Sequence, residues 1–497
     1  MPAIITNKFR IHNAEQFSES FSEASANIYY LAIGRPQPYG TLTRPDGRTD
    51  YEGTDTTPIT PGDSIVNEFN TFDDLLASKR ITSTNVSFVV PRRNWVTGTT
   101  YDIYRHDYGE YLTGSTTTRV TANSGATTLY DSTFYVLSAA NNVYKCLDND
   151  GNTASTVEPT GTSTSVLTTG DGYKWKFLYT MSASQQANFI STDFMAVATN
   201  GTVSSAAVNG ALDIVKIKTA GSAYSVTGGA TTGTITAVPI RGDGSSGVCS
   251  VTLTSGAITA VTVTTAGTNY TYAYIKNADI LAATNAGGAG SGAELDVAIP
   301  PKGGHGKNAV EELGGFFVMM NTSFEGTESA SSGDISAAND FRKIALLRDP
   351  LSAGSAATAT TLRSTYAVKI NTSPTPGTFV VDEEINQATT GAVGKVVEWD
   401  ATNKILYYLQ TRHNDAGVDS NGNKTAFSGA NVITGQTSSA TGTPDASTQT
   451  VNSVSFVSGY STPELDHDSG DVLYVENRTP IQRATDQTEN VKLIVEF

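Results

Sequence analysis

The sequence DVLYVENRTPIQRATDQTENVKLIVEF, residues 471–497, contains two apolar runs joined by a polar connector. The first run is VLYV, residues 472–475. The second run alternates, and one of its faces carries Val491, Leu493, Val495 and Phe497. Alternation with a period of two predicts a β-strand with one buried face. A chain end frays unless a sheet holds it, so we expect this strand to pair within a core with residues far earlier in the chain.

The composition of the chain favours strands over helices. Of its 497 residues, 38% are hydrophobic, only 16% are charged and 46 are glycine. β-branched residues such as Thr and Val suit a pleated surface, and glycine permits turn conformations. Long stretches of strong helix formers are absent from the sequence. We therefore predict a mainly β chain with many turns.

Charge and targeting signals exclude several classes of partner. The net charge is 32 − 48 = −16, whereas a nucleic-acid-binding protein needs a basic footprint. The N-terminal sequence lacks the pattern of a signal peptide, and no apolar run has the roughly 18 residues of a membrane span. We expect synthesis and folding in a cytoplasm, with neither nucleic acid nor membrane as a partner. Cys146 and Cys249 are expected to be buried, reduced thiols.

Changes in amino-acid composition divide the chain into five segments. Residues 1–204, 301–350 and 457–497 have ordinary composition, and we predict that they form one discontinuous β core. Residues 205–300 are poor in charge and rich in Gly, Ala, Thr and Val, and residues 351–456 form a second insertion. The Ser/Ala/Thr-rich stretch 351–361 at its start is typical of a linker.

The first insertion contains an internal repeat. Gly221 and Tyr224 recur as Gly267 and Tyr270, and the glycine-rich loop that starts at Gly244 recurs near Gly290. Each copy has the order strand, Gly-x-x-Tyr turn, glycine-rich loop, strand. Two copies are too few for a solenoid, which needs about three, so we predict a pseudo-symmetric small β-domain.

Local patterns predict individual elements. Asn13 is a candidate N-cap for a helix on which Phe17 and Phe21 share one face. A second short helix is expected at 72–76 and a helical turn at 309–313. Strands are expected at 28–33, 87–90, 143–147, 173–179, 316–320, 343–347, 379–381, 393–399 and 405–409, with a hairpin turn at 400–403.

Seven short motifs, in chain order, resemble the baseplate wedge protein called wedge subunit eight of T-even-type contractile-tailed phages. They are ITNKFR (5–10) with IGRP (33–36), TPGDS (60–64), VPRRNW (90–95), YKCL (144–147), GDGYKWKFL (170–178), DP (349–350), and ENRTPI with DQTEN (476–490). The resemblance covers roughly residues 1–200, 301–350 and 457–497, which leaves out the two insertions.

The resemblance implies a layered β-sandwich core with a few short helices in loops, here enlarged by two small all-β inserted domains. It implies a homodimeric structural protein of the virion, in the tail baseplate, that assembles with other wedge proteins and takes part in baseplate rearrangement at infection. It implies no catalytic activity and no cofactor. We expect the insertions to lie on the outside, where extra domains are tolerated, and to contact fibre or peripheral baseplate proteins.

Candidate reactive groups have simpler explanations. The five histidines are far apart in the sequence, so no zinc pattern exists. The loops starting at Asp148 and Asp419 resemble calcium loops, but Pro159 and Ala430 stand where the bidentate Glu is needed. The glycine-rich loop 242–247 lacks the Lys-Ser/Thr of a phosphate loop. We interpret all three loops as structural, and the Asp-His-Asp sequence at 466–468 as a solvated turn.

The candidate interaction site is the loop that carries Arg92, Arg93 and Trp95. It follows an expected buried strand and offers two guanidinium groups and a large aromatic ring, which are favoured at interface hot spots. We predict a protein-interface role for these three residues. The alternative is that an intramolecular Arg–carboxylate pair holds the loop.

Two other functions remain as alternatives. A tail-fibre or receptor-binding protein would use the Gly/Thr/Tyr-rich repeats to recognise glycans. A polysaccharide hydrolase would need two carboxyl groups about 5–10 Å apart in a groove, and no sequence pattern selects such a pair.

Overall fold

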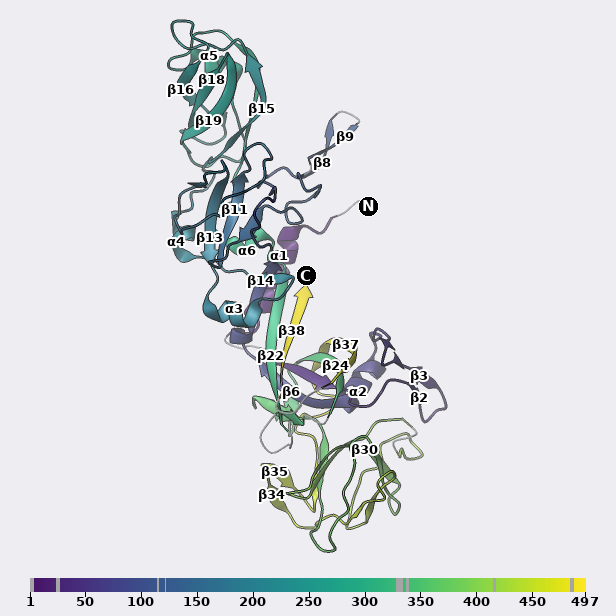
Figure 1. Cartoon of the computed structure of the whole chain (residues 1–497). Helices are drawn as coiled ribbons and strands as arrows, with labels where there is room; N and C mark the ends of the chain where they lie inside the picture. Colours follow the sequence, from purple (N-terminus) through teal and green to yellow (C-terminus); the bar gives the residue numbers. More distant parts are fainter. Residues whose placement is uncertain are drawn as a thin grey trace. The chain divides into compact units, whose positions relative to one another are not determined.

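The computed structural model describes residues 4–23, 27–113, 116–120, 122–327, 334–336, 339–413, 417–482 and 487–497. The chain forms two compact units (Figure 1): the first contains residues 1–15, 87–319 and 494–497, and the second contains residues 16–86 and 320–493. Strands account for 41% of the structure and helices for 11%. The helices are short: α1 (Asn7–Glu19), α2 (Ile65–Asp74), α3 (Ala183–Phe189), α4 (Gly201–Ala206), α5 (Asn277–Ala282) and α6 (Ala309–Leu313). The predicted mainly β fold is confirmed.

The first unit contains two facing groups of strands. One is the antiparallel sheet β10 (Tyr135–Leu137), β11 (Asn142–Asp148), β13 (Lys174–Thr180) and β12 (Leu167–Thr168). The other contains β14 (Phe194–Ala196), β7 (Val86–Pro91), β22 (Phe317–Thr327) and β23 (Ile335–Ser336), with β38 (Thr488–Glu496) on β22. Of these last strands, only residues 317–319 of β22 and 494–496 of β38 belong to the first unit. A single apolar cluster takes Val143 and Leu178 from the first group and Val89, Met195 and Met319 from the second. This shared core makes the arrangement a β-sandwich.

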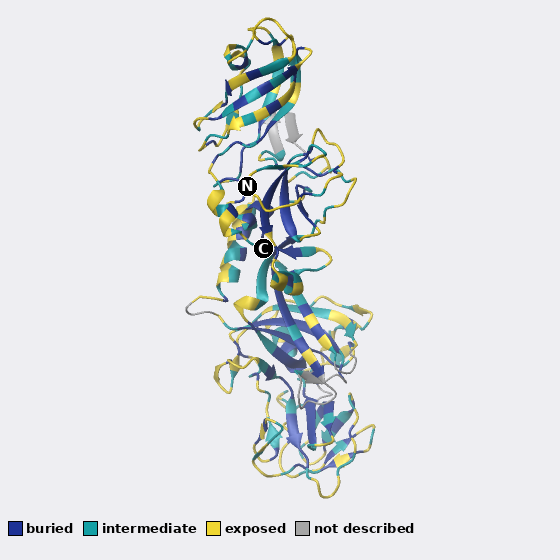
Figure 2. Ribbon diagram, turned by 60° about the vertical axis from the view of Figure 1, so that its left-hand side comes forward, coloured by how far each residue is buried: buried dark blue, intermediate teal, exposed yellow. Residues whose placement is uncertain are grey.

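The first insertion has a core of its own. Buried and less buried residues alternate along β18 (Val248–Thr254), and β19 (Ala257–Thr265) buries Ile258 and Val261. Figure 2 shows this mixture of buried and exposed residues as bands of colour. Its apolar cluster runs from Leu212 to Ile299. Its strands are β15 (Val215–Ser222) with β21 (Ser291–Val297), β16 (Gly233–Pro239) with β18 (Val248–Thr254) and β19 (Ala257–Thr265), and β17 (Arg241–Gly242) with β20 (Ala273–Tyr274).

The internal repeat builds two matching tyrosine sites. Tyr224 and Tyr270 are both buried. A Cβ added at Gly221 or Gly290 would lie 2.8 or 2.3 Å from the Tyr224 ring, and one at Gly267 would lie 2.7 Å from the Tyr270 ring. Each ring therefore packs directly on glycine backbone, which explains why the Gly-x-x-Tyr pattern and the glycine-rich loops recur together.

The second unit is built around a five-stranded antiparallel sheet. Its order is β27 (Thr361–Arg363), β6 (Leu75–Ile81), β1 (Tyr29–Gly34), β24 (Phe341–Arg348) and β37 (Asp471–Ile481). All six residues of β1 are buried, as are seven of the eight in β24. The predicted buried strands at 28–33 and 343–347 are thus confirmed within a residue or two.

The second insertion forms a seven-stranded sheet with its own apolar cluster. The order is β33 (Thr441–Gly442), β32 (Ile433–Gly435), β29 (Glu384–Gln387), β30 (Ala392–Asp400), β31 (Ile405–Leu409), β28 (Tyr366–Lys369) and β36 (Tyr460–Ser461). The Asp400 carboxylate accepts hydrogen bonds from the backbone N–H groups of Thr402 (3.0 Å) and Asn403 (2.9 Å), which confirms the predicted hairpin turn.

Several local predictions were wrong. Asn13 lies inside α1 and does not cap it. The stretch 351–361 is not a linker: it contains a short hairpin, a buried Ala357 and the first residue of β27. Residues 379–381 form no strand, although Phe379 is buried.

The terminal stretch joins two different sheets. β37 pairs with β24, whereas β38 pairs with β22. Ser323 Oγ donates to Asn490 Oδ1 at 2.8 Å, across 167 positions of sequence. Val491 and Leu493 are buried as expected, but Val495 and Phe497 are only partly buried, and Ile494 packs against the core of the first unit. Residues 483–486 of the connector lie outside the described part.

The units also differ from the predicted single discontinuous core. The residues assigned to that core are divided between the two units. The insertion boundaries shift as well, because β27 joins the five-stranded sheet and β36 joins the sheet of the second insertion.

Candidate functional site

The predicted interaction residues all make contacts within their own unit. Arg92 donates to the Ser191 carbonyl oxygen at 3.0 Å and to Asn94 Oδ1 at 3.0 Å. Trp95 is partly buried, and its Nε1 donates to Ser155 Oγ at 3.1 Å.

Arg93 is held most firmly. Its guanidinium group donates to the carbonyl oxygens of Tyr130 (3.1 Å), Asp131 (3.2 Å) and Ser132, and it lies 4.7 Å from the centre of the Tyr135 ring. The alternative of an intramolecular role therefore has direct support, with backbone carbonyls in place of the expected carboxylates. The interface role of Arg92, Arg93 and Trp95 stays a prediction.

A centre that the sequence did not suggest lies at the end of α2. Ser64 caps the start of this helix by accepting from the Asn67 N–H group, and Asp73 and Asp74 are its last two residues. Carboxylates are unfavourable at a helix C-terminus because the macrodipole is negative there. Both aspartates are also buried. They therefore need strong partners.

Asp74 ties together strands of the five-stranded sheet. Its carboxylate binds Lys343 Nζ at 2.6 Å and Arg35 Nη1 at 3.2 Å. Burial alone would raise the pKa of the Asp74 carboxyl, but the two cations outweigh burial and the pKa is lowered. Asp74 is therefore a buried, ionised carboxylate.

Asp73 faces the second insertion. Lys424 Nζ lies 2.7 Å from Asp73 Oδ1, Arg412 Nε lies 3.6 Å from Oδ2, and His467 Nδ1 lies 3.5 Å from Oδ1. Burial would raise the pKa of the Asp73 carboxyl, but His467, Lys424 and Arg412 lower it. These contacts join α2, the second insertion and the segment before β37.

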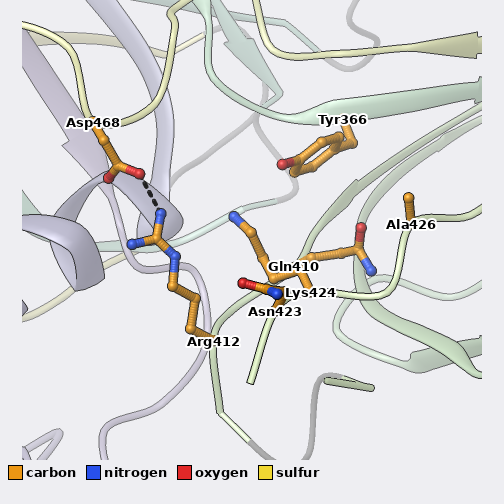
Figure 3. A pocket seen from close by; sticks show the side chains of 7 residues that line it. All are labelled: Tyr366, Gln410, Arg412, Asn423, Lys424, Ala426 and Asp468. Carbon is orange, nitrogen blue, oxygen red and sulfur yellow. Dashed lines mark hydrogen bonds and ion pairs between the residues drawn. The ribbon is translucent and has the colours of Figure 1, made fainter. Parts of the chain in front are cut away.

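A cavity of about 490 Å³ opens beside this centre (Figure 3). On one side Arg412 donates to Asp468, and Lys424 points into the cavity. The lining residues are Tyr366, Gln410, Arg412, Asn423, Lys424, Ala426 and Asp468. The two cations are matched by Asp73 and Asp468, so the cavity has no surplus positive charge for an anion.

The segment Asp466, His467 and Asp468 contains a turn at 467–468, as predicted, and Asp468 is exposed, but the segment is also held by tertiary contacts. Asp466 accepts from the backbone N–H groups of Ala353 (3.1 Å) and Gly354 (2.7 Å). His467 contacts Asp73, and Asp468 binds Arg412. Each residue has a partner more than 50 positions away in the sequence, which a local pattern cannot reveal.

In the first unit, a groove of about 1270 Å³ lies between the sandwich and the first insertion. Arg105 spans it by binding Asp107 at 2.7 Å and Asp296 at 2.8 Å, and Lys216 binds Asp148. The pKa of the Asp107 carboxyl is lowered by Arg105 against the opposing effect of burial. These carboxylates are engaged in ion pairs, which does not suit the protonated acid of a glycoside hydrolase.

A separate ion pair is sealed in the core of the first unit. Lys145 on β11 binds Glu312 on α6, and both are buried. Glu312 Oε1 also accepts from the Gly306 N–H group at 2.7 Å. The buried His305 ring packs edge-on against Tyr104 at 5.0 Å. Burial, with Lys145 and Lys176 nearby, lowers the pKa of His305 well below its usual range.

Other expectations about reactive groups have clear outcomes. Cys146 and Cys249 are free and buried, as predicted, and burial raises the pKa of Cys249 to about 11. The loop at Asp419 is a turn in which its carboxylate accepts from Asn421 and Asn423. In the described residues no group of three or more His, Cys, Asp or Glu side chains is placed to hold a metal ion.

Comparisons with known proteins do not assign the chain. No protein-family model matches it, and no curated protein is significantly similar to it. No helix in the described ranges is long and apolar enough to span a membrane.

Proposed function

We propose that this chain is a structural protein of a contractile phage tail, a baseplate wedge subunit that assembles with itself and with neighbouring wedge proteins. It acts through protein contacts, takes part in baseplate rearrangement at infection, and has no catalytic role. Its place is the virion, after synthesis in the host cytoplasm. The support comes from the seven ordered sequence motifs and from the way their segments fold.

The observation that carries the proposal is where the motif segments fall. Residues 33–36, 90–95, 144–147, 170–178 and 476–481 lie in or beside strands of the sandwich and of the five-stranded sheet. The two insertions, which show no resemblance, have separate apolar cores, and apart from the exchange of β27 and β36 their strands form separate sheets. Motifs far apart in sequence thus belong to common sheets, as expected if they descend from one wedge-like framework.

The decisive experiment is assembly. The purified chain should be a dimer by light scattering, and it should enter a complex when coexpressed with neighbouring wedge proteins of the same phage. A stable trimer, or a monomer that joins no wedge complex, would contradict the proposal.

The interface residues have a matched test. Arg92 has fewer intramolecular partners than Arg93, so Arg92→Glu should leave the fold intact while reducing assembly. Arg93→Glu should instead lower the thermal midpoint, because three backbone carbonyls lose their donor. Normal assembly by folded Arg92→Glu would contradict an interface role for that residue.

The glycan-binding alternative loses its original support, because the repeated tyrosines, Tyr224 and Tyr270, are buried structural residues. The hydrolase alternative has no observation in its favour.

A further inference from the structure

Two exposed tyrosines stand out on the first insertion. Tyr272 is 57% exposed and Tyr274 is 41% exposed, and they are the only exposed large hydrophobic residues between 212 and 299, a range that is fully described. Their ring centres lie 6.4 Å apart and the ring planes differ by only 8°. Two parallel aromatic rings are therefore presented together to solvent.

The repeat does not require these tyrosines. Each copy uses one buried tyrosine, Tyr224 or Tyr270, to fill its core. In the first copy, the positions 46 residues before Tyr272 and Tyr274 are Val226 and Gly228. The exposed pair is thus an addition to one copy only, and core packing does not explain it.

The backbone beneath the pair is firmly held. β20 pairs with β17, so that Tyr274 lies opposite Arg241. The Asp243 carboxylate accepts from the N–H groups of Thr271 at 2.9 Å and Tyr272 at 3.2 Å. A Cβ at Gly242 would lie 2.1 Å from the Tyr272 carbonyl oxygen, so only glycine fits this close approach.

Polar groups of fixed geometry surround the rings. Asp279 binds Arg241 through two hydrogen bonds, of 3.0 Å to Nε and 2.7 Å to Nη2. Lys276 Nζ lies 5.7 Å from the centre of the Tyr274 ring. These groups supply donors and acceptors beside an apolar surface, whereas the rings supply the surface itself.

We propose that Tyr272 and Tyr274 form a binding platform for a pyranose ring of a polysaccharide. The C–H groups of the sugar would pack on the aromatic rings, and its hydroxyl groups would exchange hydrogen bonds with Arg241, Asp279 and Lys276. A hydroxyl both donates and accepts, so it suits a guanidinium and a carboxylate held side by side. The ammonium of Lys276 would favour a sugar that carries a carboxylate.

The size of the platform favours a sugar over a protein. At 57% and 41% exposure, two tyrosines of about 150–250 Å² each offer together only roughly 150–250 Å², whereas a stable protein interface covers about 800 Å² on each partner. The side chains around the pair are charged or polar rather than apolar, unlike the core of a protein interface.

This binding role goes beyond the proposed structural function and does not depend on it. It rests on contacts within the first insertion alone. Direct binding to polysaccharide tests it, whereas assembly with wedge proteins tests the structural proposal, so the two can fail separately.

The test applies the full-length chain to an array of bacterial surface and other polysaccharides that includes neutral glucans, mannans and uronic acid polymers. The wild type should bind at least one of them. The double variant Tyr272→Ala/Tyr274→Ala should bind that polysaccharide roughly tenfold or more weakly by titration calorimetry. The control is Tyr51→Ala, because Tyr51 is similarly exposed, at 59%, but lies in the other unit.

Further variants sharpen the result. Lys276→Ala should weaken binding of a uronic acid polymer more than binding of a neutral one. An unchanged thermal midpoint in the double variant shows that the fold is intact. The proposal is overturned if the wild type binds nothing on the array, if the double variant binds equally well, or if the double variant loses only a protein partner.

Discussion

Both insertions are attached to the rest of their units by ion pairs, but the ion pairs of the second insertion are more deeply buried than those of the first. The first is tied across a groove by Arg105 with Asp296 and Lys216 with Asp148, whose side chains are 14–36% exposed. The second is tied through Asp73, whose side chain is 2% exposed, to Lys424 and Arg412. Exposed pairs contribute about 0–1 kcal/mol, whereas removing one partner of a buried pair costs about 3–5 kcal/mol. The burial of the ion pairs, rather than their number, should therefore determine how much they stabilise the attachment of each insertion.

The fully buried ion pair Lys145–Glu312 should show the largest loss of stability on removal of one partner. Glu312→Ala should lower the free energy of unfolding by about 5 kcal/mol, because Lys145 would remain buried without a counter-charge. Urea titration measures the change. The double variant Lys145→Met/Glu312→Leu is the control and should recover at least half of the loss, since an apolar pair avoids the desolvation cost. A double variant as unstable as the single one would show that packing, not charge, dominates.

Asp73→Ala should cost about 3 kcal/mol, near the lower end of the range for buried pairs. Lys424 and Arg412 are partly exposed, so water relieves some of their lost pairing. Urea titration and proteolysis of the second insertion measure the effect. The matched control is Asp468→Ala, which removes a more exposed partner of Arg412 and should cost less than about 1 kcal/mol. Equal losses in the two variants would refute the role of depth.

Acid should weaken the first unit through His305. Its folded pKa lies below the unfolded value of about 6.5, so the unfolded chain binds the proton more readily. The stability that neutral His305 allows is fully present above about pH 6.5 and falls as the pH drops below it. The limiting loss is about 1.4 kcal/mol per pH unit. Urea midpoints at pH 7.5 and 5.5 should differ less in His305→Gln than in the wild type; an unchanged difference would exclude His305 as the cause.

The smallest effect is expected at the groove. Asp296→Ala should lower the free energy of unfolding by less than about 1 kcal/mol, and the loss should shrink in high salt. Thermal melts at low and high ionic strength measure it. Glu294→Ala is the control, because Glu294 binds Lys218 on the neighbouring strand of the same insertion rather than across the groove. A loss of free energy comparable to that of Asp73→Ala would contradict the conclusion that the first insertion is held by weaker ion pairs than the second.

The elements that the sequence predicted correctly are those fixed by local patterns. Continuous apolar runs became the buried strands β1, β24 and β31, and the Gly-x-x-Tyr repeat became two buried tyrosine sites. The linker expected at 351–361 failed because β27 gains its stability from β6, almost 300 positions away. A stretch with low apolar content forms a loop only when no strand elsewhere in the chain has a free edge with which it can pair.

The ion centre at the end of α2 could not be predicted for the same reason. Asp73 and Lys424 are 351 positions apart in the sequence. The helix expected at 72–76 places the two aspartates near its start, where carboxylates are favoured, whereas α2 ends at Asp74, where the macrodipole disfavours them. Two such aspartates need cationic partners when they are buried, but the sequence does not indicate which residues supply them.

The adjacency of Asp73 and Asp74 also has a mechanical consequence. A load on the second insertion passes through Lys424 to Asp73, across one peptide bond to Asp74, and through Lys343 into β24. β24 is an inner strand, paired with both β1 and β37. We expect such a load to be shared by three strands. Because the two ion pairs are loaded in series, the weaker one should set the force at which this attachment breaks.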